Sequence, residues 1–112
     1  MPEASPEDAK LLILARSARV RTGAAEGAAV RDGIGRTYAA SSVELPSLRL
    51  TAVQAVVAAA VSSGSDAIEA VAVVGPLATL TDADLSVLAD LSVTTVLLAG
   101  PDGALHETTG TP

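Results

Sequence analysis

An almost entirely apolar segment in the middle of the chain constrains the fold most. From Ala52 to Val61 the only polar residue is Gln54. A helix that is apolar on every side is usually buried on every side. The alanine content and the Ser-Ser-Gly ending favour a helix over a strand. We therefore expect a central, buried helix over residues 51–63, with Gly64 as its C-terminal stop.

The first part of the chain predicts a helix and then a β-hairpin. A serine, a proline and two acids open the helix at Ser5, and Gly23 ends it. Its buried face is expected to contain Leu11, Leu14, Ala15 and Ala18. We expect the hairpin to consist of two strands, residues 27–30 and 37–43, on either side of an Asp32-Gly33 turn. Pro46 ends the hairpin.

The last part of the chain alternates between strand and helix patterns. The residues Thr81 and Asp84 have the spacing of a capping box, which predicts the start of a helix. Its expected apolar face comprises Leu85, Leu88 and Leu91. The expected strands are residues 68–74, 94–99 and a short 104–107. Such β-α-β units form parallel pairs and place helices on the sheet faces, so we expect an α/β fold.

Composition excludes several classes of function. The 112 residues include no cysteine, phenylalanine or tryptophan, and only one histidine and one tyrosine. Thiolate catalysis and a zinc site of cysteines and histidines are therefore excluded. Almost no aromatic side chain is available to stack on a nucleic-acid base. The net charge of −6 argues against a nucleic-acid partner. No apolar stretch reaches the length of a membrane span, and the chain is expected to be cytoplasmic.

Several short motifs occur in an order that suggests a family. They are Glu26-Gly27-Ala28-Ala29-Val30, Asp32-Gly33, Ser42-Val43-Glu44-Leu45, Leu50-Thr51-Ala52-Val53-Gln54 and Pro101-Asp102-Gly103. Together with the order of the elements, this set resembles the cytidine deaminase family over about residues 10–105. The resemblance implies a three-layer α-β-α domain with a mixed sheet of four to five strands. We expect one domain over residues 1–112, with an ordered core at 8–107 and a tail at 108–112.

The same resemblance implies that the catalytic residues of the family are lost. The family opens its central helix with Cys-Ala-Glu and its next helix with Pro-Cys-x-x-Cys, which supply zinc ligands and a proton shuttle. In one register these positions become Thr51 and Val53, and in another they become Val53 and Ala55. The paired cysteines become Thr81 and Asp84. We therefore expect no catalytic residue, no metal and no cofactor.

Part of the substrate side matches the family more closely. The ribose-binding Asn-x-Glu pair of the family corresponds to Ser42 and Glu44, although the aromatic segment that precedes the Gly-Ala-Ala strand is missing. These two residues are the substrate-binding candidates that the resemblance supplies.

The sequence thus predicts a catalytically inactive cytidine deaminase-like protein that acts as a binding or assembly module. Because the family is usually dimeric or tetrameric, the resemblance implies a homo-oligomer, and it leaves room for a nucleoside ligand or a protein partner. The alternative is a divergent deaminase-type hydrolase that uses Asp84 and Thr81, or a nucleoside-binding protein.

Overall fold

Five strands form the central sheet of the computed structural model, which describes residues 4–76 and 79–110. The strands are β1 (Gly27–Asp32), β2 (Thr37–Ser41), β5 (Ile68–Val74), β6 (Thr95–Ala99) and β7 (Leu105–Gly110). Their order in the sheet is β2-β1-β5-β6-β7. The β5–β6 pair is parallel and the other pairs are antiparallel. The sheet is therefore mixed and has five strands, as the sequence predicts.

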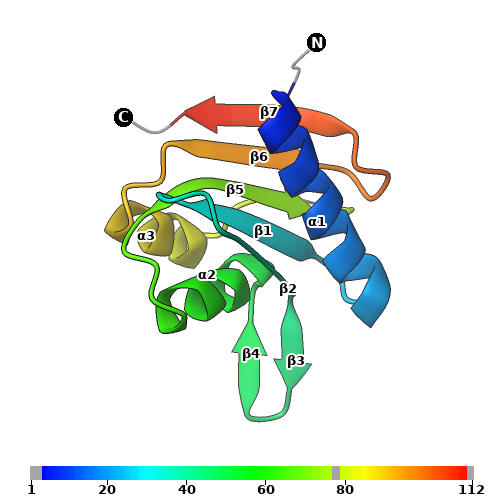
Figure 1. Ribbon diagram of the computed structural model, residues 1–112. Helices are drawn as coiled ribbons and strands as arrows, with labels where there is room; N and C mark the ends of the chain where they lie inside the picture. The colour runs from blue at the N-terminus through cyan, green and yellow to red at the C-terminus, as the bar shows by residue number, and fades with distance from the viewer. Residues whose placement is uncertain (1–3, 77–78, 111–112) are drawn as a thin grey trace.

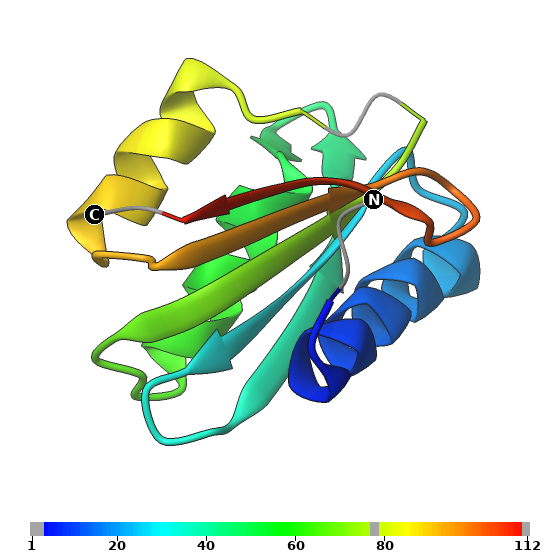
Figure 2. The same ribbon diagram turned by 90° about the horizontal axis from the view of Figure 1, so that it is seen from above.

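Three helices cover the two faces of this sheet. Helix α1 (Pro6–Thr22) lies on one face, and α2 (Ala52–Ser62) and α3 (Asp82–Asp90) lie on the other (Figures 1 and 2). Each face has its own apolar cluster, one centred on Leu11 and Ala15 and the other on Val53 and Val56. This arrangement confirms the predicted three-layer α-β-α fold. In the described part of the chain, no helix is long and apolar enough to cross a membrane.

The predicted helix ends are confirmed by their hydrogen bonds. The Ser5 hydroxyl accepts a hydrogen bond from the backbone N–H of Asp8, and Gly23 ends α1 in a left-handed conformation with φ of 69°. Both Thr51 and Thr81 begin their helices with complete capping boxes. These local signals could be recognised in the sequence because a cap involves residues only three positions apart.

The predicted buried faces need three corrections. In α1, Leu12 is buried and Leu14 is 36% exposed, because the sheet contacts a stripe slightly rotated from the predicted one. Helix α2 is not buried on every side, since Ala58 and Val61 face outward from the layer. In α3, Leu88 is buried as predicted, but Leu85 is exposed and the carboxyl group of Asp84 turns inward instead.

Two strand predictions also change. The predicted strand at residues 37–43 stops at Ser41, and a separate small hairpin follows, formed by β3 (Val43–Leu45) and β4 (Leu48–Leu50). This hairpin projects from the body of the molecule (Figure 1). The last strand extends to Gly110 rather than residue 107, because it pairs with β6 as far as Thr95. The predicted tail at 108–112 is therefore partly strand, and residues 111–112 lie outside the described residues.

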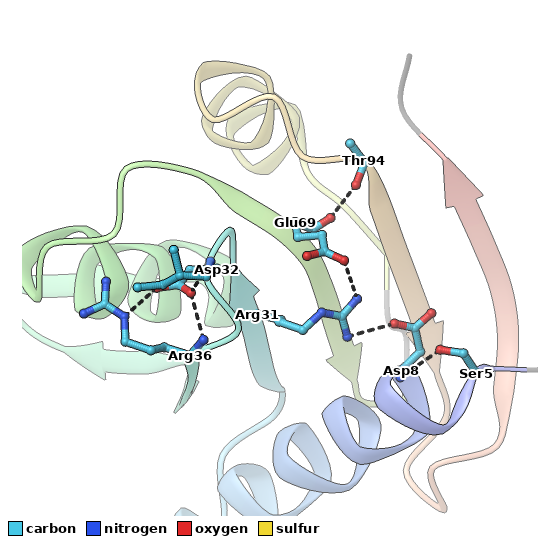
Figure 3. A network of polar contacts seen from close by, with 8 residues as sticks. Ser5, Asp8, Arg31, Asp32, Arg36, Glu69 and Thr94 are labelled. Carbon is cyan, nitrogen blue, oxygen red and sulfur yellow. Dashed lines mark hydrogen bonds and ion pairs between the residues drawn. The ribbon is translucent and has the colours of Figure 1, made fainter.

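A buried carboxylate closes the β1–β2 turn. Asp32 accepts hydrogen bonds from the backbone N–H groups of Ile34 and Arg36, from Arg36 Nε and from the Ser65 hydroxyl. Burial by itself would raise the pKa of the Asp32 carboxyl, but these hydrogen bonds lower it to about 2. The hydrogen bond from Ser65 thus anchors the Asp-Gly turn to the residues that follow α2, and Figure 3 shows Asp32 bound to Arg36 within the turn.

A second polar network joins the first helix to the sheet. Arg31 forms ion pairs with Asp8 of α1 and with Glu69 of β5, at 3.1 and 3.2 Å. The Thr94 hydroxyl donates to the backbone carbonyl of Glu69 at 2.7 Å (Figure 3). One guanidinium therefore connects α1 to two neighbouring strands near the N-terminal end of the helix.

Helix α1 crosses β1 with almost no space between the two backbones. A Cβ atom at Gly27 would clash with the carbonyl oxygen of Ala15 and would lie 2.8 Å from the backbone nitrogen of Arg19. Both obstacles are backbone atoms of a packed helix, so they cannot rotate away. Only glycine fits at this crossing.

We expect Gly27→Ala to lower the free energy of unfolding by about 2 kcal/mol or more, because α1 must move away from the sheet. The measurement is the urea midpoint from equilibrium unfolding. The control is Gly33→Ala, where the added Cβ would meet Ala67 only at ordinary contact distances, 3.6 Å from its Cβ and 3.9 Å from its carbonyl oxygen. Equal midpoints for both variants would show that the close crossing does not limit stability.

Candidate functional site

The N-termini of α2 and α3 meet at one end of the sheet, and a hydrogen bond joins them. The Thr51 hydroxyl donates to Oδ1 of Asp84 at 2.6 Å. The other oxygen of Asp84 accepts from the backbone N–H of Thr81 at 3.1 Å, and the Asp84 N–H donates to the Thr81 hydroxyl at 3.0 Å. The structure thus brings together Thr51, Thr81 and Asp84, three of the positions that the family resemblance pointed out.

The same threonine is also fixed by its own helix. The Thr51 hydroxyl accepts from the backbone N–H of Gln54 at 3.1 Å, and the Gln54 side-chain oxygen accepts from the Thr51 N–H at 2.9 Å. The Thr51 hydroxyl therefore both donates and accepts. Two capping boxes, one on each helix, are linked through a single hydroxyl–carboxylate contact.

A cavity of about 400 Å³ adjoins this network. Its polar lining comprises Glu26, Ser42, Glu44, Arg49, Thr51 and Gln54. The lining comes from the residues just before β1, the β3–β4 hairpin, the first turn of α2 and Pro76 beyond the end of β5. Segments far apart in the sequence therefore converge on one opening beside the linked helix ends.

The two predicted substrate-binding residues, Ser42 and Glu44, both line this cavity. Ser42 is held against β1, since its N–H donates to the Glu26 carbonyl at 3.0 Å and its hydroxyl accepts from the Glu26 N–H at 3.4 Å. Glu44 is exposed and lies opposite Arg49 in the register of the hairpin. Their shared location is consistent with a ligand site, and a binding role for either residue remains a prediction.

Two other candidate positions, Val53 and Ala55, lie away from the cavity. Val53 is buried in the apolar cluster between α2 and the sheet and is not among the cavity residues, and neither is Ala55. Of the two registers considered for the central helix, only the one that begins at Thr51 places a residue on the cavity wall. A valine side chain cannot transfer a proton in either register.

Glu26 lines the cavity, although the sequence patterns did not predict it as a site residue. Burial raises the pKa of its half-buried carboxyl, and the charge of Asp84 raises it further. The available signal was a charged residue directly before the buried β1 strand, in the run Glu-Gly-Ala-Ala-Val. That signal has an ordinary alternative explanation, because strand ends are commonly polar and exposed.

The fold and the cavity define a small three-layer α/β domain with a ligand-sized opening at the N-termini of two helices. The chain matches the family model described as cytidine deaminase-like over residues 4–103, and it belongs to that family. A similar solved structure is the 1.6 Å crystal structure of cytidine deaminase from Burkholderia pseudomallei. The two chains are 25% identical, the match covers 90% of each, and the TM-score is 0.78. A comparison with curated proteins found no match.

The residues at this site do not fit the zinc ion that the family resemblance implies. Zinc in proteins is bound by cysteine, histidine and carboxylate ligands. Among the described residues, no three such side chains are grouped so that they could hold a metal. Asp84 is the one carboxylate at the compared positions, and both of its oxygens already accept hydrogen bonds.

We expect Asp84→Ala to lower the free energy of unfolding by about 2 kcal/mol, because it leaves the Thr51 hydroxyl without its acceptor and removes half of a capping box. The measurement is chemical denaturation at neutral pH. The control is Asp82→Ala, an exposed acid in the same helical turn that interacts mainly with the helix dipole, and its effect should stay below about 1 kcal/mol. An Asp84→Ala variant as stable as Asp82→Ala would contradict a structural role for the network.

Proposed function

We propose that this chain is a catalytically inactive cytidine deaminase-like protein that binds a nucleoside-type ligand in the cavity beside α2. The observation that carries the proposal is the 2.6 Å contact between Thr51 and Asp84. It occupies the junction of the two helix N-termini with a protein hydrogen bond, while the neighbouring cavity stays open. In this proposal, the chain has lost the deaminase reaction of its family and has retained a ligand-binding site.

The size and lining of the cavity support a small ligand that has an apolar body and several polar groups. Its volume of about 400 Å³ lies within the usual range for small-molecule sites of roughly 300–1,000 Å³. Carboxylate, hydroxyl, amide and guanidinium groups face the same space, so both hydrogen-bond donors and acceptors are available to a sugar and a base.

The competing hypothesis is a divergent hydrolase that uses Asp84 and Thr81. A catalytic acid or base must reach a substrate atom with a free lone pair or proton. Asp84 is buried, it is not among the residues that line the cavity, and its two oxygens are engaged with Thr51 and Thr81. This geometry favours a structural role for the carboxylate over a catalytic one.

We expect at least one nucleoside among cytidine, uridine, guanosine and inosine to raise the melting temperature of the protein. A ligand at 100 times its dissociation constant adds about 2.7 kcal/mol of stability. The measurement is a thermal-shift assay on metal-stripped protein. Zinc is expected to give no shift, and cytidine to release no ammonia with or without zinc.

Two variants locate the binding site in the same assay. Ala25 is exposed on the cavity rim, so Ala25→Phe should fill the opening and abolish the shift. Ala89→Phe places the same ring on an exposed part of α3 outside the cavity and should leave the shift unchanged. Zinc-dependent ammonia release that Asp84→Ala removes without unfolding the protein would instead support the hydrolase hypothesis.

An assembly role is the second candidate, and the projecting β3–β4 hairpin favours it. Leu45 and Leu48 lie at its tip and are 54% and 49% exposed. An isolated two-stranded hairpin is marginally stable in water, and exposed leucines are stabilised when a second surface covers them. We infer that a second copy of this chain covers the tip.

Sedimentation velocity tests the assembly. The protein is expected to sediment as a dimer or larger species, and the double variant Leu45→Ser/Leu48→Ser is expected to shift toward the monomer. Ile13→Ser serves as the control, because Ile13 is an equally exposed aliphatic residue on α1. A monomeric protein at micromolar concentration would overturn the assembly role and leave the binding role unaffected.

A further inference from the structure

Glu26 occupies an unusual position on the cavity wall. It directly precedes β1, and its side chain passes beside Gly75 at the end of β5. A Cβ atom at Gly75 would lie only 2.9 Å from Cγ of Glu26. The glycine therefore leaves the room that the glutamate side chain needs beside the sheet edge, and the carboxyl group is half-buried in a defined place.

No described residue pairs with this carboxyl group. Within residues 4–76 and 79–110, no hydrogen bond or ion pair reaches it. Burial raises its pKa, and the like charge of Asp84 raises it further. A half-buried carboxylate with no protein donor is available to accept hydrogen bonds from a ligand. A ligand that supplies N–H groups would pair with both of its oxygens.

The surrounding charges restrict the class of ligand. Two acids, Glu26 and Glu44, and a single cation, Arg49, line the cavity, and the charge of Asp84 lies behind Thr51. The nearby Arg19 is engaged through Nε with the Ala25 carbonyl at 3.0 Å. A phosphate group would meet more negative than positive charge here. The balance favours an uncharged nucleoside or a free base over a nucleotide.

We propose that Glu26 determines the specificity of the cavity by accepting hydrogen bonds from a base that presents two adjacent N–H groups, as guanine does. A carboxylate has two oxygens and pairs best with two parallel donors. The proposal deepens the proposed binding function and rests on it. Glu26 acts as a binding residue, and no chemical step is assigned to it.

Isothermal titration calorimetry with guanosine and inosine tests the proposal, because inosine lacks only the 2-amino donor. Guanosine is expected to bind the protein at least tenfold more tightly than inosine, the fold-change typical of losing one hydrogen bond to a charged group. Guanosine monophosphate is expected to bind more weakly than guanosine. In Glu26→Gln, which keeps the side-chain shape, the two nucleosides should bind within about threefold of each other.

The matched control is Glu7→Gln, the same change of charge at an exposed site in the first turn of α1, and it should keep the guanosine preference. Thermal melting of both variants verifies folding, and Glu26→Ala offers a second test of the same side chain. Equal binding of guanosine and inosine, or a preference that survives Glu26→Gln, would overturn the role of Glu26.

The two proposals fail in different ways. If cytidine or uridine binds while guanosine does not, nucleoside binding stands and the specificity proposal is overturned. If none of the four nucleosides binds, both proposals are overturned.

Discussion

The close crossing of α1 and β1 at Gly27 sets the geometry on which the candidate site depends. Because no side chain separates the two backbones there, the start of β1 is fixed against the helix. The residue just before it, Glu26, is thereby fixed as well, and its backbone pairs with Ser42 at 3.0 Å. A second glycine, Gly75, gives the glutamate side chain its space. One wall of the cavity thus follows from two positions where a Cβ atom would not fit.

The opposite wall depends on the junction between α2 and α3. The N-terminus of a helix leaves backbone N–H groups unsatisfied, and each of these helices solves the problem with a capping box. The hydrogen bond from Thr51 to Asp84 then joins the two capping boxes into one partly buried network. In this member of the cytidine deaminase-like family, a hydroxyl–carboxylate hydrogen bond thus links the two helix ends. This is why stability, rather than catalysis, is the property we assign to Asp84.

Between these walls, the β3–β4 hairpin completes the cavity with few contacts to the rest of the chain. It carries Glu44 and Arg49 to the rim, and it exposes leucines at its tip. The two proposed roles use different parts of this hairpin: Glu44 and Arg49 at the cavity rim for binding, and Leu45 and Leu48 at the tip for assembly.

The sequence by itself determined the local features of this protein. The helix caps at Ser5 and Thr81 and the turn at Asp32 depend on residues a few positions apart, so they can be recognised directly in the sequence. The alternation of buried strands and helices, together with the ordered motifs, also indicated the three-layer fold and the family. These predictions were confirmed because each depends on a short window or on the order of such windows.

The tertiary structure alone decided which surfaces meet. Burial of Leu12 in place of Leu14, and exposure of Val61, follow from the angle at which each helix lies on the sheet. The contact between Thr51 and Asp84 joins residues 33 positions apart in the sequence. The Glu26 side chain, just before β1, lies beside Gly75, just after β5. Sequence spacing carries no information on such distances, because side chains far apart in the chain are brought together only by packing. The elements of the fold were therefore predictable, whereas the candidate site was only partly so.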